Sequence, residues 1–135
     1  MIVDIHTHNA QTHAQTIDTI GIHPWQALVG DISAVEKGIA AADAIGEIGL
    51  DFACNVPHEE QERIFRAQLT LAEQYQKPVV LHCVRAFEEA MRILRDFNLP
   101  VVIFHGFIGS VEQAQRSVKQ GYYLSFGERT FRSPK

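Results

Sequence analysis

The chain is poor in cysteine, in positive charge and in long apolar runs. Its 135 residues include only 2 cysteines, Cys54 and Cys83, and neither belongs to a C-x-x-C pair. We therefore expect neither a disulfide framework nor a zinc finger. The formal net charge of −4 provides no general basic field for nucleic acid or an anionic membrane. Bound cations must therefore supply any attraction for an anionic substrate.

No apolar run approaches the ~20 residues that span a bilayer, and no basic-then-apolar export segment precedes Asp4. We therefore expect no membrane partner and a cytoplasmic protein, in which both thiols stay reduced.

The composition is that of a globular domain, with 46% hydrophobic and 21% charged residues. Apolar runs alternate with helix-period stretches, which predicts β/α units around a parallel sheet. We expect strands over residues 1–6, 19–23, 44–47, 78–82, 101–105 and 122–126, and helices over 31–42, 57–76, 86–97 and 110–121.

Two helices have clear local signals. In the second, Ile64, Leu71 and Ala72 share a face with Gln68, and we expect this face to pack on the sheet. In the last, Ser110 and Gln113 have the spacing of a capping box. These apolar faces indicate core packing rather than ligand binding.

Five metal-seeking side chains lie at the ends of short apolar runs: His6, His8, Glu47, His82 and His105. Side chains along a strand alternate between faces, so His6 and His8 point the same way and can hold one ion. The other three come from three later strands, whose carboxyl ends meet at one face of a barrel. The pattern predicts the metal site of a hydrolase.

Each position also has a structural interpretation. A buried carboxylate at Glu47 could pair with an arginine, and a lone histidine after an apolar strand is often a core residue. We favour metal binding, with Glu47 as the catalytic bridging ligand, because His82 and His105 have the same placement in successive units.

His23 and Arg85 are candidates for substrate contact. His23 ends an expected strand, although the Pro24 and Trp25 that follow it could simply shape the loop. Arg85 lies three residues beyond His82, near enough to bind a phosphate, and a surface salt bridge is the alternative.

In several strings the chain resembles the TatD-like deoxyribonuclease family of the amidohydrolase superfamily. Gly-Ile-His-Pro at 21–24 and Gly-Glu-Ile-Gly-Leu-Asp at 46–51 are the most specific. Further matching strings lie at 4–8, 78–83, 105–109 and 121–126, so that the resemblance covers nearly the whole chain.

The resemblance implies an α/β fold of the TIM-type barrel and one or two divalent metal ions. His6 and His8 would hold the first ion, His82 and His105 the second, and Glu47 would bridge them. It also implies metal-dependent hydrolysis of DNA phosphodiesters by an activated water, often as a 3′ to 5′ exonuclease on single strands or 3′ ends. Histidine and carboxylate ligands do not identify the metal, which could be magnesium, manganese or zinc.

The chain also departs from the family. Family members carry a later Glu-Thr-Asp-like string, whose aspartate completes the first metal site and is the expected general base, and this chain reaches Lys135 without it. A complete barrel needs about 200–250 residues, and we expect about six of its eight strands here. We therefore expect one hydrolase domain over 1–135, truncated at its C-terminus, with open edges that favour self-association.

Two alternatives stay open. One is a metal-dependent hydrolase of another substrate class, such as a phosphatase or an amide or ester hydrolase. The other is an inactive, truncated barrel.

Overall fold

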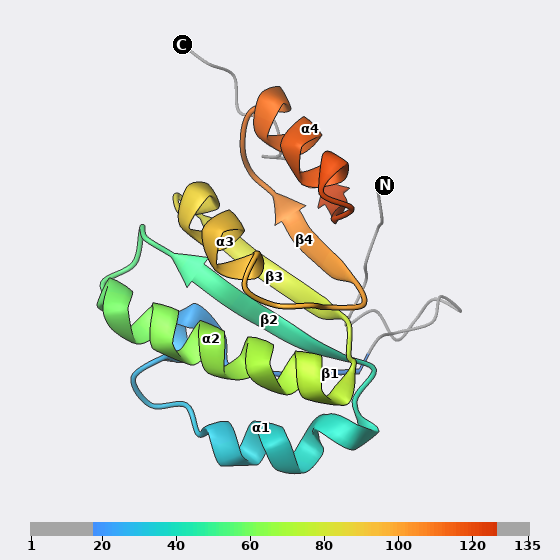
Figure 1. Ribbon diagram of the computed structural model, residues 1–135. Helices are drawn as coiled ribbons and strands as arrows, with labels where there is room; N and C mark the ends of the chain where they lie inside the picture. The colour runs from blue at the N-terminus through green and yellow to red at the C-terminus, as the bar shows by residue number, and fades with distance from the viewer. Residues whose placement is uncertain (1–17, 127–135) are drawn as a thin grey trace, which may run out of the picture.

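The computed structural model, in which residues 18–126 are described, contains five parallel strands in one sheet (Figure 1). The strands follow one another across the sheet in chain order. They are β1 (Thr19–Ile20), β2 (Ala44–Asp51), β3 (Val79–Val84), β4 (Val102–Phe107) and β5 (Tyr123–Phe126). The connections contain α1 (Ile32–Gly38), α2 (His58–Tyr75), α3 (Phe87–Leu94) and α4 (Val111–Lys119), with short 3-10 turns η1 (Pro24–Gln26) and η2 (Ile39–Ala41). This order is that of a partial TIM-type barrel and confirms the predicted α/β class.

Several element boundaries differ from the predicted ones; the helix expected over 31–42, for example, is α1 followed by η2. The strand expected over 19–23 ends at Ile20, because His23 instead caps the 3-10 turn η1. The strand expected over 44–47 continues to Asp51, since β2 shifts register between Ile45 and Ile48 and then pairs with β3 again. The helix expected over 86–97 is shorter, Phe87–Leu94. The first expected strand, 1–6, lies outside the described residues.

The two faces of the sheet have different roles. Leu81 and Phe104 belong to the main core, which also contains the buried faces of the helices. Val80 and Ile103, one residue earlier on each strand, lie in a smaller cluster formed by strand residues alone. This alternation follows the two-residue period of a strand. Burial of each large aliphatic side chain stabilises the fold by about 1.5–3 kcal/mol.

Helix α2 joins the sheet to the segment that leads into η1. Glu59 and Glu60 occupy its first turn, where carboxylates oppose the positive end of the helix dipole. Gln68 is fully buried, as its place on the apolar face predicted. Its Oε1 accepts from the Ile22 N–H at 2.6 Å, and its Nε2 donates to the Ile22 carbonyl at 3.1 Å. The helix thus fixes the backbone immediately before His23.

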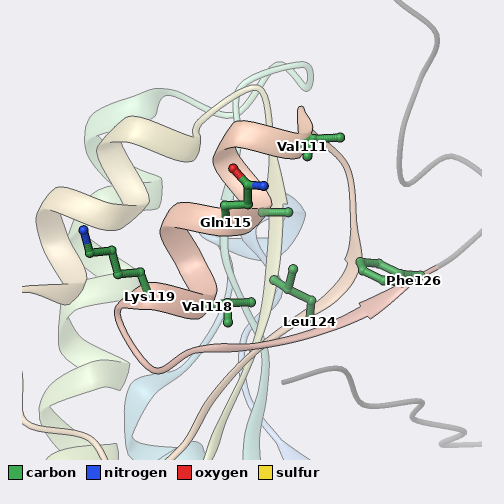
Figure 2. A pocket seen from close by; sticks show the side chains of 7 residues that line it. Val111, Gln115, Val118, Lys119, Leu124 and Phe126 are labelled. Carbon is green, nitrogen blue, oxygen red and sulfur yellow. The ribbon is translucent and has the colours of Figure 1, made fainter.

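An apolar groove of about 380 Å³ lies between α4 and β5, which is an edge strand among the described strands (Figure 2). Helix α4 has the predicted capping box: Ser110 Oγ accepts from the Gln113 N–H at 3.0 Å, and Gln113 Oε1 accepts from the Ser110 N–H at 3.1 Å. Val118 and Leu124 line the groove from the helix and the strand. Within residues 18–126, no helix has the length and apolarity needed to cross a membrane.

Candidate metal centre

Three of the predicted ligands converge from neighbouring strands. Glu47 on β2 faces His82 on β3 and His105 on β4. Glu47 Oε1 lies 3.6 Å from His82 Nδ1, and Glu47 Oε2 lies 3.4 Å from His105 Nε2. All three side chains are partly buried. The two oxygens of one carboxylate therefore face two different imidazoles.

Strand periodicity explains why the histidines share a face. His82 lies two residues after Val80, and His105 two residues after Ile103, so both point to the side of the smaller apolar cluster. The three residues were predicted at the ends of their strands. They instead lie inside β2, β3 and β4, which each continue for two or more residues.

Each of these two pairs, Glu47 with His82 and Glu47 with His105, fits two ligands of a metal ion. The separations of 3.4 and 3.6 Å exceed the ordinary hydrogen-bond range of about 2.7–3.2 Å. Two ligands that each lie about 2.0–2.1 Å from one tetrahedral ion are separated by about 3.4 Å. A carboxylate oxygen with an imidazole nitrogen at this spacing is a donor set for a divalent cation.

His23 also approaches this cluster but presents a different atom. His23, Glu47 and His82 offer ligand atoms within 4.8 Å of one another, and His23 Nε2 lies 4.0 Å from Glu47 Oε1. His23 Nδ1, however, accepts from the Trp25 N–H at 3.2 Å. In the neutral ring the proton is then on Nε2, so the atom nearest Glu47 is a donor rather than a metal-binding lone pair.

The cluster shifts the pKa values of its members in opposite directions. Burial opposes the charged form of Glu47, but His82, His105 and His23 together hold the pKa of its carboxyl below the usual value. Burial also opposes the charged form of His82, yet Glu47 and Asp51 raise its pKa. Burial, followed by the charge of His82, lowers the pKa of His23. Glu47 is therefore held as a carboxylate and His23 as a neutral ring.

Two further contacts hold the rings of the ligand histidines. His82 Nε2 lies 2.9 Å from Asp51 Oδ2, which also accepts from Trp25 Nε1 at 2.7 Å. His105 Nδ1 lies 3.3 Å from Ser125 Oγ, which accepts from the Gly106 N–H at 2.9 Å. A hydrogen bond on the far nitrogen of a metal-binding imidazole typically fixes both its tautomer and its orientation.

The remaining predicted residues have different outcomes. His6 and His8, the predicted ligands of the first ion, lie outside the described residues. Arg85 is exposed and lines a separate cavity of about 410 Å³ near the start of α3, which contains none of the clustered residues. Within residues 18–126 Arg85 forms no ion pair, so no partner for the alternative, a surface salt bridge, is seen among these residues.

Sequence reasoning missed the supporting residues Asp51, Trp25 and Ser125. Asp51 lies four residues after Glu47, a spacing that places two strand residues on one face, so the pattern could have indicated it. Trp25 and Ser125 carry no such signal, because their roles depend on a turn and on pairing between distant strands.

Comparison with known proteins gives consistent matches. A family model described as TatD related DNase matches residues 3–135. The 3′-5′ ssDNA/RNA exonuclease TatD of Escherichia coli (strain K12) is 37% identical over 123 residues, which cover 85% of this chain and 47% of that protein. The uncharacterized metal-dependent hydrolase YabD of Bacillus subtilis (strain 168) is 36% identical over 120 residues, or 80% of this chain and 46% of that protein. The chain thus spans about half the length of the curated relatives that it matches.

Solved structures match the fold over a similar share. The crystal structure of YjjV, a TatD homolog from Escherichia coli K12, has a TM-score of 0.69 and 35% identity, and the match covers 78% of this chain and 44% of that one. A hydrolase of the TatD family from Entamoeba histolytica has a TM-score of 0.71 at 23% identity, covering 86% and 43% of the two chains, and at that identity it supports the fold alone.

Proposed function

This chain belongs to the TatD-related DNase family, and from that premise we propose that it carries the metal site of a hydrolase that cleaves DNA phosphodiesters. One observation carries the proposal. Both oxygens of Glu47 face imidazole nitrogens, at 3.6 Å from His82 and 3.4 Å from His105, a spacing that suits a divalent cation. A cation held there would supply activation of water and neutralisation of phosphate charge.

The residues of the chain have separate roles in this proposal. His82 and His105 would hold one cation, His6 and His8 would hold the other, and Glu47 would be a ligand of both. His23 directs its Nε2–H toward the same place and donates a hydrogen bond to an oxygen of the reacting phosphate. Arg85 contacts the DNA backbone on one side of that phosphate.

The substrate follows from charge and from the relatives. Because the chain has a net charge of −4, DNA would be attracted locally by the cations and not by a basic surface. The relative from Escherichia coli is named for 3′-5′ action on ssDNA and RNA, so we propose single strands with free 3′ ends as the substrate. Because Cys54 and Cys83 are both free, we place the activity in a reducing cytoplasm.

The test uses purified protein and a 5′-labelled single-stranded oligonucleotide, with magnesium, manganese or zinc added after removal of bound metal. We expect stepwise shortening from the 3′ end that depends on the metal. Glu47→Gln keeps the shape of the side chain and should abolish shortening, whereas Glu36→Gln, the same change at an exposed position on α1, should not. Intact DNA alongside cleavage of a small phosphoester or an amide would favour the alternative substrate classes.

A further inference from the structure

The carboxylate of Asp51 is surrounded by hydrogen-bond donors next to the candidate metal centre. Asp51 Oδ2 accepts from Trp25 Nε1 at 2.7 Å and lies 2.9 Å from His82 Nε2. Asp51 Oδ1 accepts from the Ala53 N–H at 2.9 Å. The Asp51 side chain is only 6% exposed, so these protein groups replace most of its contact with water.

This arrangement dictates where His82 carries its proton. An ionised carboxylate only accepts hydrogen bonds, so the nitrogen that faces Asp51 must be Nε2–H. In the neutral ring the other nitrogen, Nδ1, then has a free lone pair, and Nδ1 is the atom 3.6 Å from Glu47 Oε1. The ring therefore presents the atom that can bind a metal toward the carboxylate that would share it.

Trp25 sets the opposite arrangement in the neighbouring ring. Its backbone N–H donates to His23 Nδ1 at 3.2 Å, while its indole N–H donates to Asp51. His23 therefore turns an N–H toward Glu47, and His82 turns a lone pair toward it. The ring centroids of His23 and His82 are only 4.3 Å apart, so two adjacent imidazoles present different groups to Glu47. Trp25 bonds to His23 directly and reaches His82 through Asp51.

We infer that Asp51, together with the Trp25 indole N–H that donates to it, is a positioning group that makes Nδ1 of His82 the metal-binding atom. The inference rests on the proposed metal-dependent function and adds the groups that prepare its site. Neither residue touches the reacting atoms, and each acts through a histidine.

The Asp51 carboxylate is not needed to hold the end of β2 in place, because the backbone of Asp51 has hydrogen bonds of its own. Gln61 Oε1 accepts from the Asp51 N–H at 2.7 Å, and Gln61 Nε2 donates to the Asp51 carbonyl at 2.9 Å. The same amide also donates to the Val56 carbonyl at 3.0 Å. The end of β2 is thus held by Gln61, and we expect the fold to survive a change in the Asp51 carboxylate.

The experiment compares Asp51→Asn and Trp25→Phe with the unchanged protein. Asparagine can turn its amide N–H₂ toward His82 Nε2, which would move the proton of His82 to Nδ1. Phenylalanine removes only the indole N–H and keeps the backbone N–H that His23 uses. Asp96→Asn is the matched control, because Asp96 is an exposed carboxylate paired with Arg66 at the surface.

Two measurements are made in the full chain. Zinc affinity is measured by competition with a chelating dye. The tautomer of His82 in the metal-free protein is read from nitrogen-15 spectra of the imidazoles, recorded at a pH above the raised pKa of His82, where the ring is neutral. We expect zinc affinity to fall about 100-fold in Asp51→Asn and about 10-fold in Trp25→Phe, the range typical when a group that holds a metal ligand is lost. The proton of His82 should move to Nδ1 in Asp51→Asn alone, and Asp96→Asn should match the unchanged protein.

The outcomes separate the inference from the proposed function. If the unchanged protein binds no zinc, magnesium or manganese, the proposed function fails. If it binds zinc and both variants bind equally well, with His82 in its original tautomer, the inference alone is overturned. Circular dichroism checks the fold of each variant. If Asp51→Asn does not fold, Trp25→Phe decides, and unchanged zinc affinity in that variant overturns the inference.

Discussion

Replacement of Gln68 by leucine should destabilise the fold through the segment that carries His23. The Gln68 amide pairs with both the N–H and the carbonyl of Ile22, at 2.6 and 3.1 Å, and both residues are buried. Leucine leaves both backbone groups without these partners. Each buried unsatisfied group costs about 1–3 kcal/mol, so the pair costs about 2–6 kcal/mol.

The apolar surface of the leucine offsets part of this loss, by about 1–2 kcal/mol. The expected net change in the free energy of unfolding is therefore about 2.5 kcal/mol, a large share of the 5–15 kcal/mol that is typical for a domain. Urea denaturation followed by circular dichroism measures it, as a lower midpoint at an unchanged slope.

Gln74→Leu is the matched control, because Gln74 lies on the exposed side of the same helix. The control should change the free energy of unfolding by less than about 0.5 kcal/mol. If Gln68→Leu loses less than about 1 kcal/mol, or no more than the control, then the contacts with Ile22 do not stabilise the fold as argued.

Four further results are expected. Glu47→Ala should lose bound metal and activity together while the fold remains, and elemental analysis that still finds the full metal content would contradict its role as a ligand. Arg85→Ala should raise KM for single-stranded DNA several-fold with kcat unchanged, and an equal KM would remove Arg85 from substrate binding. Burial raises the pKa of the Cys83 thiol to about 12, so at pH 8 only about 10⁻⁴ of it is thiolate, and in a Cys54→Ser variant it should react with a thiol reagent far more slowly in the folded than in the denatured protein. Gly49→Ala should markedly lower the unfolding midpoint, because Gly49 has φ +144° and a Cβ there would overlap the His82 carbonyl.

The parallel sheet could be predicted because strands that are buried on both faces have continuous apolar runs in the sequence. Runs such as 79–81 and 102–104 are continuously apolar, and their length and spacing indicate buried parallel strands. The two-residue period then places His82 and His105 on one face without any structural information. The helix faces and the capping box at Ser110 follow equally local rules.

The course of β2 and the supports of the site could not be predicted in this way. Ile45 and Ile48 both belong to the main core although they are three positions apart, which breaks the simple alternation. The break coincides with the register shift of β2 against β3. The contact between Trp25 and Asp51 joins a turn to a strand end 26 residues away. Such a contact depends on the folded backbone, and no periodic pattern encodes it.

The consecutive order of the strands also has a consequence for synthesis. Each strand from β2 to β5 pairs with the strand made just before it, so each of these four strands has a partner already synthesised when it leaves the ribosome. During folding, each new strand can therefore be added to the same edge of the sheet. This order limits the time for which an unpaired strand is exposed to aggregation. Protease protection of ribosome-stalled chains of increasing length should accordingly rise in steps, and a single rise at full length would contradict this order. Glu47 and His82 would then meet as soon as β3 emerges, and His105 would join them one β/α unit later.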